Sequence, residues 1–289
     1  MPTITTLPDL SVVLHPEWHP TARIEFYEEH FERGMKQCQR ILTTSDFSRR
    51  QIVEELGFPA ALVTRTYCGV NPDLRPLPAE AVRQRKQEMG LPEDYLLYVG
   101  TLEPRKNLLM LLKAYCSLPA NVRDHCQLVL VGGWGWNTQE LAAFLEDQAR
   151  SRGVMHLGYV PDEQLITLYN GARALLFPSF YEGFGLPPLE MMACGGAVLV
   201  STAEALVETT GGHGHTIDPH DDDGWRSAML RIIQDDEWRD HLRQGVVAWA
   251  KRFTWERCAE ETLEAYRLCL DAPSTPTPLR SVIDRLGEP

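Results

Sequence analysis

The sequence lacks the basic excess that marks proteins binding nucleic acid. Of its 289 residues 28 are basic and 40 are acidic, which gives a formal net charge of −12. Nucleic-acid binding requires a basic face, so we expect no nucleic-acid partner. The same balance gives no general attraction to anionic lipid.

Long apolar runs and paired cysteines are also missing. No uncharged apolar stretch is long enough to cross a bilayer, and residues 1–20 have neither the basic start nor the apolar centre of a signal peptide. The seven cysteines are scattered without a CxxC pair, which is typical of reduced thiols. These absences predict a cytoplasmic protein, and they leave peripheral contact with the inner face of a membrane open.

Two further signatures are absent. Residues 132–136, GGWGW, do not match the GxGxxG fingerprint of dinucleotide-binding dehydrogenases, and no acidic residue ends the strand expected at 154–158. Residues 211–215, GGHGH, with His220 and the acidic run at 221–223, do not have the spacing of a complete metal-ligand set. A loop followed by the acidic start of a helix is the favoured interpretation.

What the chain does contain is a regular alternation of apolar strands and helices from residue 91 onward. Continuous apolar strands divided by helices are typical of a parallel sheet covered on both faces. Ligands bind such sheets beyond the carboxyl ends of the strands. The expected strands are 95–100, 127–133, 154–158, 173–179 and 197–201, and helices are expected at 137–153, 221–234, 236–251 and 254–270.

Residues 1–86 predict a thinner α/β unit that ends in a proline-rich linker, 71–80. Two or three strands form a sheet that needs support from elsewhere. The expected strands are 3–13, 40–46 and 61–70, and the expected helices are 22–38 and 48–57.

The decapeptide YEGFGLPPLE, residues 181–190, combines a flexible turn with a helix start. Gly183 and Gly185 allow tight turning, and Pro187 and Pro188 suit the first turn of a helix, where amide hydrogens lack intrahelical acceptors. The free amides and the positive end of the helix dipole at such a site bind anions, most simply phosphate.

Two carboxylates, Glu182 and Glu190, flank this turn. A carboxylate would repel phosphate, so hydrogen bonds from ligand hydroxyls are the more plausible role. For Glu190, a place in the first helical turn is also a sufficient structural explanation, because the helix dipole favours negative charge there. A ligand with both phosphate and vicinal hydroxyls is a nucleotide sugar.

Arg105 and Lys106 lie at the junction between the strand 95–100 and the helix that follows. Cations are disfavoured at a helix N-terminus, so this pair indicates an anion such as a diphosphate. A solvated pair at a helix start is the alternative, and Asn107 is expected to cap that helix.

GTLEPRKN, residues 100–107, together with residues 158–195 resembles the retaining glycosyltransferases of family 4, which have the GT-B fold. The likeness extends to FTWERCAEETLEAY, residues 253–266, and the Glu-x7-Glu signature of the family corresponds to Glu182 and Glu190. The resemblance implies transfer of a hexose, with mannose favoured, from a nucleotide diphosphate sugar to a glycan or lipid-linked acceptor with retained configuration.

The resemblance also implies roles for individual residues. Arg105 and Lys106 would bind the diphosphate, Glu190 the ribose hydroxyls, and Glu182 would lie close to the transferred sugar; Glu182, Arg105 and Lys106 form the implied catalytic group. The donor would be GDP- or UDP-linked, with no metal and no cofactor, because the cations and the helix dipole replace the metal. The implied donor-binding residues are Gly100, Thr101, Gly132, Gly133, Tyr159, Val160, Phe184, Gly185, Leu186 and Glu190.

The implied fold class is α/β of the GT-B type: one complete Rossmann-like, doubly wound parallel-sheet domain at 87–253 and an incomplete second one at 1–86. A C-terminal helix and tail, 254–289, would pack back towards the N-terminal part. The glycine-rich loop of the family's N-terminal domain has no counterpart, so an N-terminally truncated member is expected. Pro8 replaces an active-site histidine of the family and cannot donate a proton.

These departures keep a second interpretation open. The chain could be a catalytically weak or inactive nucleotide-sugar-binding subunit that needs a partner supplying the missing half. Uncovered apolar faces and sheet edges predict self-association or such a partner under either interpretation.

Overall fold

The computed structural model describes residues 2–271 and divides the chain into two compact units. Of the described residues, the larger unit contains 70–180 and 186–252, and the smaller contains 2–69, 181–185 and 253–271. The larger unit therefore begins at Val70 and includes the proline-rich linker, whereas the sequence had placed the boundary after residue 86. The part of the expected C-terminal segment beyond residue 271 lies outside the described residues.

The larger unit is built on a parallel sheet of six strands in the order β6-β5-β4-β7-β8-β9. The five strands predicted from the sequence are present as β4 to β8. The sixth, β9, lies in the segment interpreted as a loop; two of its three residues are exposed, so no apolar run marks it. The strands are β4 (Asp94–Val99), β5 (Cys126–Val131), β6 (Val154–His156), β7 (Ala174–Phe177), β8 (Ala197–Ser201) and β9 (His215–Ile217).

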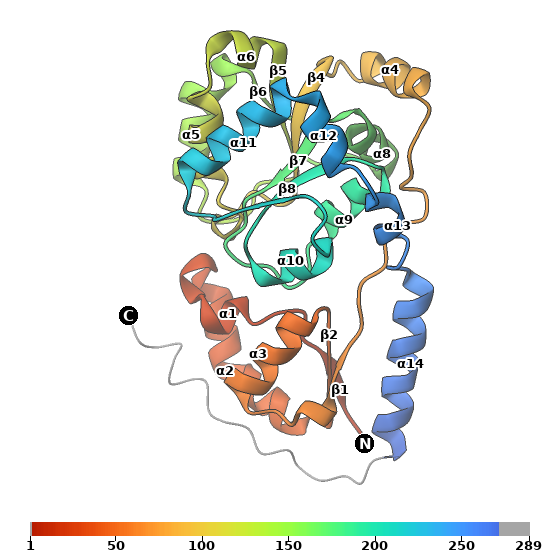
Figure 1. Ribbon diagram of the computed structural model, residues 1–289. Helices are drawn as coiled ribbons and strands as arrows, with labels where there is room; N and C mark the ends of the chain where they lie inside the picture. The colour runs from red at the N-terminus through yellow and green to blue at the C-terminus, as the bar shows by residue number, and fades with distance from the viewer. Residues whose placement is uncertain (1, 272–289) are drawn as a thin grey trace. The chain divides into compact units, whose positions relative to one another are not determined.

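Helices cover both faces of this sheet, which explains why β7 and β8 are buried at every residue. α5 contacts both α7 and α11, and a second series of contacts joins α4 to α8, α8 to α9, and α9 to α10 and α13; Figure 1 shows α5 and α11 on the left of the sheet and α4 and α8 on the right. The helices of this unit are α4 (Ala79–Glu88), α5 (Leu108–Cys116), α6 (Ala120–His125), α7 (Gln139–Phe144), α8 (Asp162–Gly171), α9 (Leu186–Ala193), α10 (Glu204–Thr210), α11 (Asp222–Gln234), α12 (Asp236–Leu242) and α13 (Val246–Ala250).

Two expected helices of the larger unit are interrupted. The helix expected at 236–251 is the pair α12 and α13, separated by residues 243–245, of which Gly245 precedes α13 and has φ 76°. The helix expected at 137–153 begins as α7, continues as one π-helical turn and one 3-10 turn, and ends at Gly153, which has φ 91°. Glycine occupies both positions because side chains are disfavoured at positive φ.

The smaller unit contains a parallel sheet of three strands in the order β1-β2-β3. The strand expected at 3–13 is much shorter, because Pro8 lacks an amide hydrogen and the Asp9 carboxylate accepts a hydrogen bond from the Ser11 amide (2.8 Å), which starts a helix instead. The elements are β1 (Ile4–Thr6), α1 (Ser11–Leu14), α2 (Thr21–Gln37), β2 (Arg40–Thr43), α3 (Asp46–Leu56), β3 (Val63–Arg65) and α14 (Trp255–Asp271).

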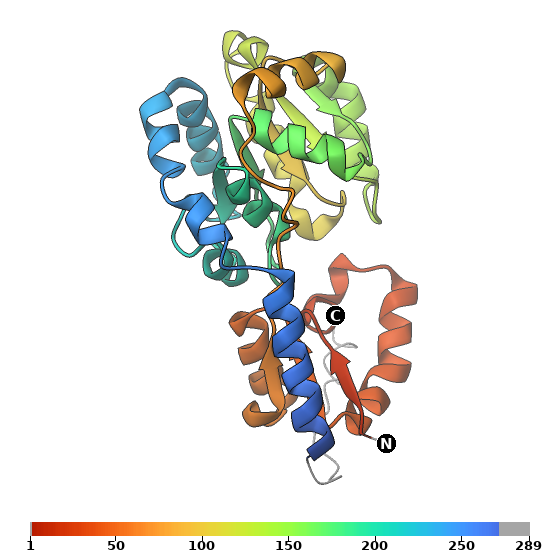
Figure 2. The same cartoon turned by 90° about the vertical axis from the view of Figure 1, so that its right-hand side faces the viewer.

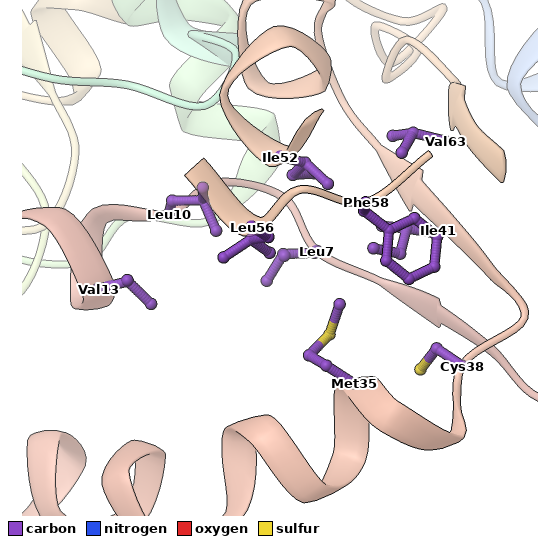
Figure 3. Close-up of a cluster of buried hydrophobic side chains, with 10 residues drawn as sticks. All are labelled: Leu7, Leu10, Val13, Met35, Cys38, Ile41, Ile52, Leu56, Phe58 and Val63. Atoms are coloured by element: carbon purple, nitrogen blue, oxygen red, sulfur yellow. The ribbon is translucent and has the colours of Figure 1, made fainter. Parts of the chain in front are cut away.

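The core of the smaller unit joins all three strands or their flanking loops to its helices. Figure 3 shows Leu7, Ile41 and Val63 from the sheet region facing Ile52 and Leu56 of α3, with Met35 of α2 alongside. The last helix, α14, packs against β2 and runs beside the strands of this unit (Figure 2). This unit therefore combines residues from both ends of the chain.

One edge of the small sheet is open among the described residues. β1 pairs with β2 alone, and a cavity of about 410 Å³ lies between β1 and α2. Its walls include Phe26, which is 59% exposed, and Tyr27 and Phe31. Edge strands beside apolar surface are prone to pairing with another chain.

The seven cysteines all lie within residues 2–271 as free thiols. Burial raises the pKa of Cys126 to about 12 and that of Cys68 to about 11, which disfavours the reactive thiolate. Within the described part of the chain, every helix is too short or too polar to cross a bilayer.

Candidate functional site

The loops at the carboxyl edge of the six-stranded sheet carry most of the expected site residues. The strand order reverses between β4 and β7, so the loops that follow these two strands lead to opposite faces of the sheet. A crevice at such a switch point is the usual ligand site of doubly wound sheets. Arg105 and Lys106 follow β4, and Phe180 follows β7; the Phe180 amide donates to the Arg105 carbonyl (3.0 Å).

Backbone hydrogen bonds connect the loops after β4, β5 and β6 to one another. The Gly132 amide donates to the Gly158 carbonyl (2.8 Å), and the Leu102 amide donates to the Gly133 carbonyl (3.0 Å). A further bond runs from the Gly135 amide back to the Leu102 carbonyl (2.9 Å). The three loops therefore form one continuous wall, independent of the side chains they carry.

Gly132 is required for this arrangement. A Cβ atom there would stand 2.0 Å from the carbonyl oxygen of Gly100, and Gly132 has φ 135°. Only glycine permits both the close approach and the backbone conformation. At neighbouring Gly133, in contrast, a Cβ would meet nothing within 4 Å.

Tyr159 and Val160 follow β6 and lie in the same set of loops. The Tyr159 side chain is 82% exposed, whereas Val160 is buried. His156, at the end of β6, contacts the loop after β5: its Nε2 is 2.8 Å from the Gly132 carbonyl oxygen, and its ring meets Trp134 edge-on at 5.3 Å. The structure thus brings the expected residues Gly132, Tyr159 and Val160 to one region, and adds His156.

Arg105 and Lys106 occupy a 3-10 turn, Pro104–Lys106, between β4 and α5. An Nη2 atom of Arg105 donates to Glu103 Oε1 (2.8 Å), and the two side chains are only 15% and 4% exposed. Lys106 is buried, with Nζ 5.0 Å from the centre of the Phe177 ring. A buried carboxylate paired with an arginine orients the guanidinium, and the sequence interpretation did not include Glu103.

Asn107 does not cap α5 as expected. It has φ 56°, its side chain makes no capping hydrogen bond, and its Nδ2 instead donates to the Pro219 carbonyl (2.7 Å). The prediction that Asn107 caps α5 fails because a capping residue typically has an extended backbone, whereas Asn107 is left-handed and its side chain bonds to Pro219. Asn107 ties the turn that carries Arg105 and Lys106 to the loop after β9.

The helix predicted after the decapeptide turn is α9, and it begins at Leu186 with Pro187 and Pro188 in its first turn, as expected. Glu190 is the fifth residue of α9 and lies beyond the first turn, so the explanation through the helix dipole is wrong. Its partner is a side chain: Tyr169 Oη of α8 donates to Glu190 Oε2 (2.7 Å).

Burial raises the pKa of Glu190, the hydrogen bond from Tyr169 lowers it, and the charge of Asp162 raises it. Burial and the charge of Glu190 raise the pKa of Tyr169 well above its ordinary value of 10. The phenol therefore stays protonated and acts as the donor of this bond.

Glu182 belongs to the smaller unit, in the segment Tyr181–Gly185. Tyr181 Oη accepts from the Leu10 amide (3.2 Å) and donates to Gln51 Oε1 (2.5 Å). The carbonyl oxygen of Gly183 accepts from Thr44 Oγ1 (3.1 Å) and from Ser48 Oγ. Glu182 itself is buried, 6% exposed.

Phe184 and Gly185 complete this segment. The Phe184 ring lies 5.9 Å from Tyr67 and 6.0 Å from Phe253 within an aromatic cluster of the smaller unit. Its side chain is thereby committed to packing, so a ligand contact at Phe184 would use the backbone. Gly185 has φ 103°, which agrees with the expected glycine turn.

Pro8 adjoins the segment that carries Glu182. Its carbonyl oxygen accepts from Thr44 Oγ1 (3.0 Å), and a Cβ added at Gly183 would stand 2.7 Å from that same oxygen. Pro8 thus contributes a carbonyl acceptor here, and its ring offers no proton.

The decapeptide is divided between the units. Tyr181–Gly185 belongs to the smaller unit, and Leu186–Glu190 belongs to the larger unit together with Arg105 and Lys106. Three histidines of the suspected metal loop have other surroundings: His213 and His215 lie against Trp249 and Trp238, and His220 lies 5.0 Å from Phe180. Residues 2–271 contain no group of three His, Cys, Asp or Glu side chains that could bind a metal ion.

These features define a class of protein: an α/β protein of the GT-B type. Sucrose-phosphate synthase from Thermosynechococcus elongatus superimposes with a TM-score of 0.76 at 25% identity, covering 93% of this chain and 68% of that one. HepE of Anabaena, solved in complex with UDP and glucose, gives 0.76 at 18% identity, covering 94% and 72%. The latter likeness concerns the fold alone.

The family follows from the sequence comparison. The profile described as "Glycosyl transferases group 1" matches residues 82–247, more than half of the chain. O-antigen chain mannosyltransferase B of Escherichia coli is 40% identical over 266 residues, which cover 92% of this chain and 70% of that protein. The chain belongs to the group 1 glycosyl transferases, and it is a transferase with mannosyltransferase relatives.

Proposed function

We propose that this chain is a retaining family 4 enzyme that transfers a mannosyl residue from a nucleotide diphosphate sugar, GDP- or UDP-linked, to a hydroxyl of a glycan or lipid-linked acceptor. The bond between the anomeric carbon and the donor phosphate oxygen breaks, and a bond to the acceptor oxygen forms on the same face of the sugar. The nucleoside diphosphate leaves, and the proton that the acceptor hydroxyl releases is taken up by the departing diphosphate or by solvent.

The observation that carries this proposal is the pair Arg105 and Lys106 at the carboxyl edge of the sheet, in the unit that also carries α9 and Glu190. Their positive charges would stabilise the negative charge that develops on the departing diphosphate, and this electrostatic term is commonly the largest in such chemistry. The pairing of Arg105 with Glu103 would pre-orient the guanidinium.

The remaining roles follow the same division. Glu190 would accept hydrogen bonds from the ribose, and Gly132, Tyr159 and Val160 would line the base. Glu182, with the backbone of Phe184, Gly185 and Leu186, would contact the transferred sugar. Mannose is favoured by the 40% identity to O-antigen chain mannosyltransferase B, and a polysaccharide acceptor by the name of that relative.

Calorimetric titration with GDP, UDP and ADP tests the donor site. At least one should bind, and Arg105→Ala should weaken it by roughly tenfold to a hundredfold, because charge-assisted hydrogen bonds to phosphate are lost. Arg85→Ala is the matched control, since Arg85 is exposed on α4 of the same unit. If wild-type protein binds none of the three diphosphates, the proposed function is wrong.

Transfer is tested separately, by incubating the chain with GDP-mannose, UDP-glucose and mannose-containing acceptors and analysing the product linkage by NMR. An α-linked product from an α-linked donor is expected. Binding without transfer would contradict the enzyme and support the inactive subunit instead.

The expectation of self-association or of a covering partner stays a prediction. Sedimentation velocity tests its simplest form, because the open edge of β1 favours pairing with another chain. A purely monomeric species over the micromolar range would contradict self-association.

A further inference from the structure

A buried phenol contacts the carboxylate that we expect to bind ribose. Tyr169 is 1% exposed and lies on α8, whereas Glu190 lies on α9, 21 residues further along the chain. The 2.7 Å hydrogen bond between them is charge-assisted, a class roughly twice as strong as neutral hydrogen bonds. Because Tyr169 is enclosed, it acts on any ligand only through Glu190.

The position of this phenol is fixed by bonds on both sides of it in the sequence. The carbonyl of Leu168 accepts from Tyr95 Oη of β4 (2.9 Å). On the other side, Asn170 Oδ1 accepts from the Leu77 amide (2.8 Å), and its Nδ2 donates to the Arg75 carbonyl (3.0 Å). α8 is thereby attached to the central strand and to the segment before α4, so Tyr169 has little freedom to move.

The bond from Tyr169 engages only one of the two oxygens of the Glu190 carboxylate. Tyr169 occupies Oε2 of Glu190, and Oε1 has no hydrogen-bond partner within residues 2–271. A carboxylate that can rotate presents either oxygen and loses that freedom on binding, whereas a carboxylate fixed at one oxygen has lost it beforehand. Burial is the larger effect and raises the pKa of Glu190, and the bond from Tyr169 acts against it by favouring the charged, accepting form.

We propose that Tyr169 is a positioning residue, which fixes Glu190 so that its free oxygen accepts hydrogen bonds from the vicinal hydroxyls of a nucleoside diphosphate. This inference rests on the proposed function, since it assumes a ribose at Glu190. It adds that recognition of the ribose depends on a side chain that never touches it.

The test compares a ribonucleotide with the same nucleotide lacking both ribose hydroxyls. GDP, UDP and ADP are titrated into wild-type protein, and the one that binds is compared with its 2′,3′-dideoxy analogue. Wild-type protein should prefer the ribonucleotide. Tyr169→Phe should weaken ribonucleotide binding about tenfold, because the released carboxylate then has to lose its rotational freedom on binding, and it should leave the dideoxy affinity within about twofold.

Two comparisons separate positioning from a general effect on the fold. Tyr115→Phe removes another buried phenol hydroxyl of the same unit, one that donates to the Cys126 carbonyl (3.0 Å), and it should not change the preference for ribose. In a Glu190→Ala background, adding Tyr169→Phe should produce no further loss of preference. Thermal unfolding of each variant verifies that it is folded.

Equal weakening of both nucleotides by Tyr169→Phe would overturn the inference, because a structural defect alone predicts it. An unchanged preference for ribose would overturn it as well. If wild-type protein binds no diphosphate, the proposed function fails together with this inference; if it binds and only the preference is unaffected, this inference alone fails.

Discussion

The two units hold their functional loops by different means. In the larger unit, the loops after β4, β5 and β6 are joined by hydrogen bonds from backbone to backbone, such as Gly132 to Gly158. In the smaller unit, the segment Tyr181–Gly185 is held by side-chain hydroxyls, those of Tyr181, Thr44 and Ser48. These three loops of the larger unit thus depend on the backbone geometry that glycine permits, whereas the segment Tyr181–Gly185 depends on the identity of side chains around it.

The same contrast applies to the two carboxylates of the decapeptide. Glu190 lies on a helix, α9, and is fixed by Tyr169 of a neighbouring helix. Glu182 lies in an irregular segment whose flanking residues carry the anchoring bonds. Glu190, for which we propose a role in donor binding, therefore lies on a helix, whereas Glu182 is placed by a short segment that hydroxyl groups anchor.

The largest effect is expected at Gly132. Gly132→Ala places a Cβ 2.0 Å from the Gly100 carbonyl oxygen at φ 135°, so both loops must shift. We expect a loss of about 2–4 kcal/mol in the free energy of unfolding, from strain and overpacking together. Thermal and urea unfolding measure it, and hydrogen exchange should increase at residues 100–103 and 132–135.

Gly133→Ala is the matched control, because a Cβ there meets nothing within 4 Å. It should change stability by less than about 1 kcal/mol. Similar losses of unfolding free energy in Gly132→Ala and Gly133→Ala would contradict the claim that the close approach of Gly132 to Gly100 determines how these loops pack.

A smaller effect is expected for Tyr181→Phe in the smaller unit. The variant keeps the ring but leaves the buried Leu10 amide without its acceptor and Gln51 without its donor. A cost of about 1–2 kcal/mol is expected from the unsatisfied amide. Hydrogen exchange measured by mass spectrometry should show lost protection at residues 8–14 and 181–185.

Tyr266→Phe serves for comparison, since Tyr266 lies on α14 of the same unit and is 43% exposed. Removal of the Tyr266 hydroxyl should leave both the free energy of unfolding and the hydrogen exchange unchanged. Unaltered protection at Leu10 in Tyr181→Phe would show that the hydroxyl does not anchor the segment.

The sequence predicted the larger unit well for a physical reason. A parallel sheet covered on both faces produces strands that are apolar at every position, as β7 and β8 are. Strand β9 was not predicted because it is a short edge strand in which His215 and Thr216 are exposed. The N-terminal segment was misjudged because apolar residues after Pro8 suit a short helix as well as a strand, and the Asp9 turn decides between them.

Site residues divide in a similar way. Arg105, Lys106 and Glu190 stand out by their local context of strand ends, glycines and prolines. Glu103 was missed although it lies two residues from Arg105, because spacing alone does not reveal a buried pair. Tyr169 and His156 were missed because their partners, Glu190 and Gly132, lie 21 and 24 residues away, and only the folded structure brings them together.

The buried charge of Glu190 gives a pH-dependent prediction. Burial raises the pKa of Glu190 in the folded protein above the ordinary 4.5. Between the unfolded and the folded pKa, the native state therefore binds more protons than the unfolded state. The free energy of unfolding consequently falls as pH rises from 4.5 through the folded pKa. Glu190→Gln removes this loss while its carbonyl can still accept from Tyr169. The variant should therefore melt higher than wild type at pH 7, and the difference should shrink as pH falls below 4.5.

Glu163→Gln is the control on α8, where the exposed carboxylate should give no such gain. Glu190→Gln should also bind ribonucleotide more weakly, which is the usual conflict between stability and function at a site. A variant that melts lower than wild type at pH 7 would contradict the assigned cost of the buried charge.

The smallest effect is expected at Ser179, which follows β7 in the larger unit. Its hydroxyl is fully buried and has no hydrogen-bond partner within residues 2–271, so Ser179→Ala removes a desolvated group and should be neutral or stabilising by up to about 1 kcal/mol. The equally buried Ser201 donates to the Ser179 carbonyl (2.5 Å), and Ser201→Ala should cost about 1–2 kcal/mol. Urea unfolding measures the free energy of unfolding of both variants. If both lose the same amount, the loop after β7 relies on side-chain hydroxyls as the segment Tyr181–Gly185 does. The contrast between the two units would then not extend to this loop.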